Sequence, residues 1–172
     1  MIKEFNTTGS CNPAMHYMVD TSKKLAQIED FILRGKYFTI NRARQFGKTT
    51  TMNSLFRQLS SRCVVIKISF EGFGPDSYKN EEMFVRSFME EVADRLVKTN
   101  QADYAEAWSK PVASLNELSR KINEFCGSCE KEVVLLIDEV DKSLDNQLFL
   151  HFLGMLRDLY LERSESGDMH ST

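Results

Sequence analysis

The sequence lacks any apolar run that approaches the ~18 to 20 residues that a membrane-spanning helix needs. Its first residues, Met1-Ile2-Lys3-Glu4-Phe5, also lack the apolar core of a signal peptide. These two absences predict a cytoplasmic protein with no membrane partner. In that compartment we expect the four cysteines to stay reduced.

The chain has no excess of basic charge either. Its 172 residues include 22 Lys and Arg against 25 Asp and Glu, which gives a net charge of −3. A general nucleic-acid binder is usually basic, so the charge does not indicate a nucleic-acid partner, although this balance still allows a basic patch on one face. The length suits one domain with a sizeable core, and we expect a single domain over residues 1–172.

Residues with the spacing of metal ligands are scarce. His16, His151 and His170 are scattered, and Cys126 and Cys129 form one Cys-x-x-Cys with no second pair. One such pair is half a zinc site at best, and the order of elements does not give the setting of a thioredoxin. We interpret the two cysteines as part of a helix-to-strand turn, with a metal or redox role as the minor alternative.

Helical patterns alternate with short apolar strands along the chain, and we find no internal repeat. Residues 1–20 are expected to form an irregular lead-in and residues 164–172 a frayed tail. The expected helices run from residue 21 to a stop at Gly35 and over about 48–60, 80–98, 102–108, 112–125 and 146–162, and the expected strands cover 37–41, 63–70 and 133–137. This alternation predicts an α/β fold with a mainly parallel sheet covered on both faces.

The run from Arg42 to Thr50 lies between the expected strand 37–41 and the helix that follows it, where a phosphate-binding loop is expected. Its ending Gly47-Lys48-Thr49 matches a loop in which backbone N–H groups and the lysine contact the phosphates and the hydroxyl binds Mg²⁺. The residues expected to bind the nucleotide are Arg44, Gln45, Phe46, Gly47, Lys48, Thr49 and Thr50.

The loop departs from the G-x-x-x-x-G-K-[ST] pattern at its first position, where this chain has Arg42. Residues other than glycine can make that turn when φ is negative, so binding need not be lost. Arg44 has two open interpretations, a phosphate contact or a solvated charge.

A second motif follows about ninety residues later, where the apolar run 133–137 ends in Asp138 and Glu139. This is the form of a Walker B element. We expect Asp138 to hold Mg²⁺ together with Thr49, and Glu139 to act as the catalytic base beside the catalytic Lys48. The alternative is that the strand simply reaches solvent and ends in two acids with no catalytic role. This alternative stays open for Glu139 in particular, because charged residues continue after it.

Beyond these two motifs, the sequence resembles the AAA-like domain family of bacterial predicted ATPases. The resemblance is carried by four segments, residues 5–13, 16–20, 37–50 and 136–142. It implies an additional-strand P-loop NTPase fold of three α/β/α layers, related to the archaeal-type and signalling ATPases, and Arg42 in place of glycine is normal for it.

That family has the sheet order 5-1-4-3-2, and no apolar strand follows Leu161 here. The resemblance therefore implies a fold that is incomplete at its C-terminus, with strands 37–41 and 133–137 separated by a gap or paired directly. We expect a fragment or a truncated gene product that needs a further C-terminal region or a partner subunit.

The function expected from the sequence is ATP and Mg²⁺ binding, with ATP hydrolysis by the intact protein driving a conformational change in attached regions. The alternative is a truncated, non-hydrolysing nucleotide-binding or protein-interaction module. A nuclease or DNA-processing role would need a cluster of catalytic acids and a lysine, which we do not find.

Overall fold

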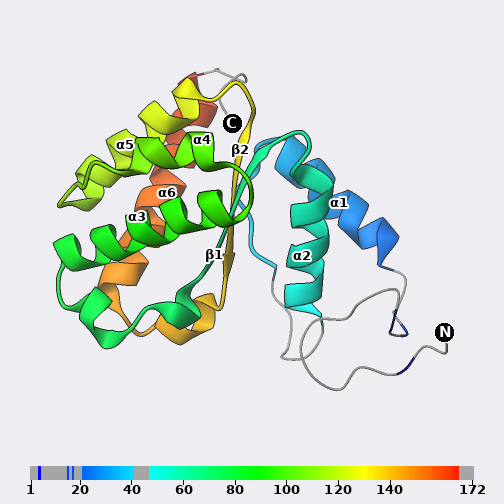
Figure 1. Cartoon of the computed structure of the whole chain (residues 1–172), viewed down its shortest axis with the longest axis horizontal. Coiled ribbons are helices and arrows are strands. Elements are labelled where there is room, and N and C mark those ends of the chain that lie inside the picture. The colour runs from blue at the N-terminus through cyan, green and yellow to red at the C-terminus, as the bar shows by residue number, and fades with distance from the viewer. Residues whose placement is uncertain (1–3, 5–14, 16, 18–20, 41–46, 167–172) are drawn as a thin grey trace. The chain divides into compact units, whose positions relative to one another are not determined.

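The structure, a computed structural model, describes residues 4, 15, 17, 21–40 and 47–166, apart from the side chains of residues 141, 142 and 166. The chain forms two compact units, Met1–Ser61 and Arg62–Thr172. Figure 1 shows the elements of both units in chain order.

The described part of the first unit consists of two helices, α1 (Ser22–Leu33) and α2 (Lys48–Leu59). Their buried residues recur every three to four positions, as expected for helices with one apolar face. These residues are Ile28, Ile32, Thr51, Met52, Leu55 and Leu59. The predicted helix stop is confirmed, because Gly35 has φ 60° and its N–H donates to the carbonyl of Ile32 at 2.8 Å.

The predicted strand over 37–41 is wrong for the residues that the structure describes. Residues 37–40 form no strand, and Asn41 lies outside the described residues. Tyr37 and Thr39 are exposed, while the ring of Phe38 lies 5.6 Å from that of Phe31 on α1. The apolar pattern of this segment thus supplies a packing contact, but a strand also needs the backbone of a neighbour.

The second unit contains a small parallel sheet of two strands, β1 (Val64–Ser69) and β2 (Val133–Asp138). The register pairs Val64 with Val133 and Ser69 with Asp138. Both strands were predicted from their apolar runs, and each boundary differs from the prediction by no more than one residue. Because side chains alternate between the two faces, every second residue of each strand faces the helices of this unit.

Several helical segments connect and follow these strands. They are the short 3₁₀ segments η1 (Phe70–Gly72), η2 (Pro75–Tyr78), η3 (Glu106–Trp108) and η4 (Val140–Ser143) and the α-helices α3 (Glu81–Lys98), α4 (Ala102–Ala105), α5 (Leu115–Ser128) and α6 (Gln147–Ser166). In Figure 1 the helices α3 to α6 lie on one side of the sheet. None of the helices in the described ranges is both long and apolar enough to cross a membrane.

Aromatic rings fill the core between the sheet and these helices. Phe70 at the end of β1 packs edge-on against Phe149 of α6, with ring centroids 4.7 Å apart, and Phe84 of α3 lies 5.3 Å from Phe152. All four rings are at most 2 % exposed. Burial of several large rings supplies most of the hydrophobic stabilisation in a unit of this size.

Two helix boundaries differ from the prediction for identifiable reasons. The helix predicted from residue 112 begins at Leu115, because the Ser114 hydroxyl caps it by accepting a hydrogen bond from the Glu117 N–H at 3.2 Å. In return, the Glu117 carboxylate accepts from the Ala113 N–H at 2.7 Å. The tail predicted to fray from residue 164 is helical through Ser166, and the helix-breaking residue Gly167 follows it in the sequence.

Among the described residues, it is a side chain that binds the backbone of β1 at its outer edge. The amide of Gln101 accepts a hydrogen bond from the Val65 N–H and donates one to the Val65 carbonyl, both at 3.2 Å. The same amide nitrogen donates to the Thr99 hydroxyl at 2.8 Å. Gln101 therefore imitates the backbone of a neighbouring strand and blocks pairing at this edge.

Candidate functional site

The first half of the candidate site is the N-terminus of α2. Gly47 precedes the helix with φ 75° and ψ 26°, a left-handed conformation that L-residues rarely adopt. The first bond of the helix joins the Thr51 N–H to the Gly47 carbonyl at 2.9 Å. The N–H groups of residues 48–50 therefore precede the intrahelical ladder and have no acceptor within the helix.

This helix end suits an anion for a second reason. The first turn, Lys48-Thr49-Thr50-Thr51, contains no acid that would neutralise the positive end of the helix dipole. Lys48 is half-buried and Thr49 is exposed. The structure thus brings together backbone donors, one ammonium group and one hydroxyl, which is the chemistry that a phosphate group needs. The predicted contacts of Arg44, Gln45 and Phe46, like Arg42, lie outside the described residues.

The second half of the candidate site is the carboxyl end of β2. Asp138 is the last residue of the strand, and its Oδ1 accepts a hydrogen bond from the Glu139 N–H at 3.0 Å. Glu139 has φ 57° and ψ 35°, so the chain turns sharply into η4. A left-handed conformation costs a residue with a Cβ about 1–2 kcal/mol. It turns the backbone at Glu139, so the chain leaves the direction of the strand that ends at Asp138.

The loop after Glu139 is held by a buried hydrogen bond. Ser143, the last residue of η4, is 5 % exposed, and its hydroxyl lies 2.7 Å from the hydroxyl of Tyr78 at the end of η2. A buried hydroxyl that lost this partner would be left desolvated. The hydrogen bond between Ser143 and Tyr78 therefore holds the segment that follows Asp138 and Glu139 in place.

A lysine that the sequence analysis did not single out lies beside Asp138. Lys67 of β1 is opposite Leu136 in the register, so it shares a sheet face with Asp138, two residues further along. Burial lowers the pKa of Lys67; attraction to Asp138 opposes that shift, and repulsion from Arg95 adds to it. The available signal was a lone charged residue in the apolar run 64–68.

Each half of the candidate site contains one oxygen donor that was predicted to bind a metal. The Thr49 hydroxyl and the Asp138 carboxylate fit a hard cation such as Mg²⁺. In the part of the chain that the structure describes, no three His, Cys, Asp or Glu side chains gather as a metal cluster. Thr49 belongs to the first unit and Asp138 to the second, and each supplies an oxygen donor of the kind that Mg²⁺ prefers.

The Cys-x-x-Cys pair lies at the end of α5, in the segment that leads into β2. Cys126 belongs to the last turn of the helix and Cys129 is its C-cap, whose N–H donates to the Cys126 carbonyl at 3.3 Å. Both are free thiols. Burial raises the pKa of Cys126 to about 11, so the group stays protonated at neutral pH. The interpretation as a helix-to-strand turn is confirmed for this segment.

The predicted site residues thus fall into two groups. Gly47, Lys48, Thr49 and Thr50 lie together in the first unit, and Asp138 and Glu139 lie together in the second. The roles predicted for these residues stay predictions.

Comparison with known proteins agrees with this pair of motifs. The family model of the AAA-like domain matches residues 9–170, which include both halves of the candidate site. No curated protein and no solved structure matches the chain. The match covers nearly the whole sequence and confirms the resemblance carried by the motifs: this chain belongs to the AAA-like domain family.

Proposed function

We propose that this chain is a P-loop ATPase domain that binds ATP with Mg²⁺ and hydrolyses it. The observation that carries the proposal is the start of α2, where Gly47 is left-handed and the first turn offers N–H groups, an ammonium and hydroxyls with no competing acid. Membership of the AAA-like family supports it, because the family suggests nucleotide binding of the P-loop type. In this proposal the sheet of β1 and β2 is part of a three-layer α/β/α fold.

Each predicted residue then has a role in binding. The backbone N–H groups of residues 47–50 donate to phosphate oxygens, and Arg44, Gln45 and Phe46 complete the loop around them. The ammonium of Lys48 neutralises charge on the β- and γ-phosphates. Oxygens of Thr49 and Asp138 hold Mg²⁺, which neutralises further negative charge as the phosphate is transferred.

Glu139 has the role of catalytic base. Its carboxylate accepts a proton from the attacking water while the water oxygen forms a bond to the γ-phosphorus. The bond between the γ-phosphorus and the oxygen that bridges to the β-phosphate breaks, which yields ADP and inorganic phosphate. Lys48 stabilises the charge that develops on the phosphate oxygens, so catalysis depends on positioning and electrostatics.

The test combines equilibrium binding of a fluorescent ATP analogue with a phosphate-release assay on the whole chain. We expect Lys48→Ala to abolish binding and Glu139→Gln to retain binding while abolishing turnover. Lys36→Ala and Asp145→Asn are matched controls, because both residues are exposed and lie outside the two motifs. Loss of binding in both controls would contradict the proposed site.

One outcome would favour the alternative function. If the wild type binds the nucleotide but shows no turnover above Glu139→Gln under any condition, the chain is a non-hydrolysing nucleotide-binding or interaction module. In the ATPase proposal, hydrolysis drives movement in a further region or a partner subunit, and GTP in place of ATP is a competing substrate for the same assay.

A further inference from the structure

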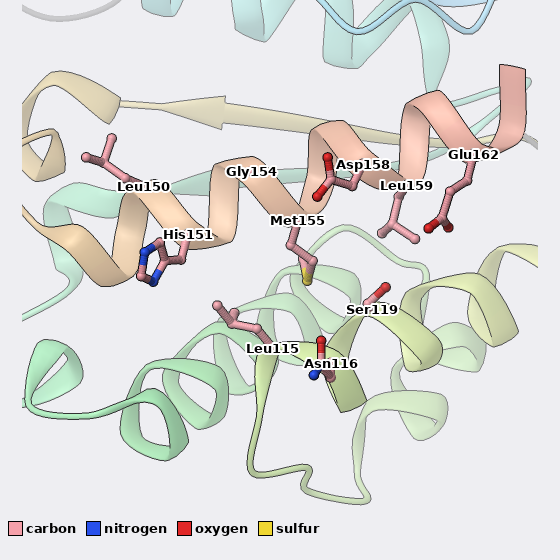
Figure 2. A pocket seen from close by; sticks show the side chains of 10 residues that line it. All are labelled: Leu115, Asn116, Ser119, Leu150, His151, Gly154, Met155, Asp158, Leu159 and Glu162. Carbon is pink, nitrogen blue, oxygen red and sulfur yellow. The ribbon is translucent and has the colours of Figure 1, made fainter. Parts of the chain in front are cut away.

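A groove with a volume of about 450 Å³ lies between α5 and α6, and none of the candidate site residues lines it. Its apolar lining includes Leu115 from α5 and Leu150, Met155 and Leu159 from α6. Figure 2 shows Met155 pointing from α6 toward α5 and Leu115 pointing back toward α6. Leu150 is 39 % exposed at one end. Polar side chains, among them Asn116, Ser119 and His151, line the groove beside these apolar ones, and a groove of this mixed lining between two helices suits an amphipathic helix.

A glycine in the middle of α6 lines the same groove. A Cβ added at Gly154 would meet no described atom within 4 Å, so the described part of this chain leaves space for a side chain at this position. Glycine is unfavourable inside a helix, since it increases the backbone entropy that folding removes. Its position at the groove leaves room for another backbone to approach α6 closely.

The acids at the other end of the groove are arranged differently from those elsewhere on the surface. In the other described helices, acids commonly lie four residues from a cation. These ion pairs are Asp30 with Arg34, Glu90 with Arg86, Glu91 with Arg95 and Asp94 with Lys98.

Asp158 and Glu162 lie four residues from each other, both are exposed, and neither has an ion pair with any residue that the structure describes. Like charges at this spacing destabilise a helix. A cation brought by a ligand would remove that repulsion, because it would bind between two carboxylates that already lie on the same side of α6.

We propose that the groove between α5 and α6 binds a basic amphipathic helix of a partner protein. Apolar side chains of that helix lie against Leu115 and Met155, its closest approach is at Gly154, and its Lys or Arg residues pair with Asp158 and Glu162. A second copy of this chain fits less well, because it carries a net charge of −3 toward an acidic rim. The proposal does not depend on nucleotide binding.

The probe for this proposal is a synthetic helical peptide of about five turns, with leucine and alanine on one face and lysine along its flanks. Its matched control carries glutamate at every lysine position. Titration of the whole chain, followed by the amide resonances of the protein, should show binding of the basic peptide with shifts centred on Gly154, Met155 and Asp158. The acidic peptide should not bind.

Two pairs of variants locate the binding. The double change Asp158→Asn with Glu162→Gln should weaken binding by about three- to tenfold, because two rim charges are lost. The matched double change Glu124→Gln with Glu130→Gln, also at exposed acids, should leave the affinity unchanged. Gly154→Leu should fill the groove and abolish binding, whereas Gly127→Leu, at another helical glycine with free space around it, should not.

Several results would overturn the proposal. Equal affinity for the acidic and basic peptides would do so, as would equal weakening in the two acid double variants. Concentration-dependent dimerisation that shifts the groove resonances would assign the groove to a second copy instead. If Gly154→Leu fails to fold by circular dichroism, the charge variants decide the question, since they alter only exposed side chains.

Discussion

Lys67 and Asp138 lie on the same face of two paired parallel strands, offset by two positions, and their charges attract each other across the strand boundary. The relationship places a half-buried ammonium beside the acid that ends β2. Cross-strand pairs of opposite charge contribute to sheet stability when their side chains can reach each other. Burial works against this pair, because it lowers the pKa of Lys67 from its ordinary value of 10.5.

The lowered pKa of Lys67 predicts a defined pH dependence of stability. The folded state binds the Lys67 proton less tightly than the unfolded state. At pH values below the lowered pKa, Lys67 is protonated in both states, so the free-energy cost of burying its charge is constant. As the pH rises through that value toward 10.5, the free energy of unfolding should increase relative to that of Lys67→Met. Urea denaturation of both proteins at several pH values measures the difference, with the exposed Lys98→Met as control. A difference that falls with pH would contradict the sign.

The amide of Gln101 predicts a second effect on stability. Gln101→Leu removes both partners of the Val65 backbone, and Val65 is only 1 % exposed. Buried backbone groups without partners should lower the free energy of unfolding by roughly 1–3 kcal/mol. Denaturant unfolding gives the magnitude, and hydrogen exchange should show faster exchange at the Val65 amide. Gln147→Leu, at an exposed glutamine, should change stability by less than about 0.5 kcal/mol; an equal loss there would mean that the edge contact is not the cause.

Helix caps give a third prediction with a control inside the same chain. Asn80 precedes α3 and accepts a hydrogen bond from the Met83 N–H at 2.9 Å, so Asn80→Ala should cost about 1 kcal/mol. Thr21 precedes α1 without a side-chain cap hydrogen bond to the described residues, and Thr21→Ala should cost much less. Chemical denaturation of the two variants compares them directly. Similar losses would show that the cap at Asn80 is not the stabilising contact.

The raised pKa of Cys126 predicts slow alkylation. With a pKa of about 11, this thiol should hold roughly a hundredfold less thiolate at pH 8 than an ordinary cysteine. Mass spectrometry of the chain after iodoacetamide treatment should show slow labelling at Cys126 that reaches the ordinary rate in urea. The same shift implies that stability decreases as the pH rises from about 9 through 11, because the folded state keeps the proton that the unfolded state releases. Fast labelling of the folded chain at pH 8 would restore the redox alternative.

The sequence predicted the elements whose signals are local. The apolar run before Asp138 marked β2, and Gly35 marked the end of α1, since a helix stop depends on neighbouring residues. The segment 37–41 was predicted as a strand from its apolar residues, although a strand is defined by a partner that the local sequence does not show.

The candidate site was predicted in part for the same reason. Gly47 and Lys48 lie consecutively, so their motif and their geometry are both local. Lys67 and Ser143 act through partners at other positions, Asp138 and Tyr78, which are brought close only by the sheet register and by packing. A single sequence contains no direct signal for such pairs.

The central claim is that the ammonium of Lys48 and the carboxylates of Asp138 and Glu139 act on one nucleotide. The most direct measurement is the paramagnetic broadening of amide resonances by Mn²⁺ bound with a non-hydrolysable ATP analogue, with Mg²⁺ as the diamagnetic control. The account predicts that resonances of residues 48–50 and of residues 138–139 broaden together, and that Lys48→Ala abolishes both effects. Broadening confined to one of the two groups would contradict the account.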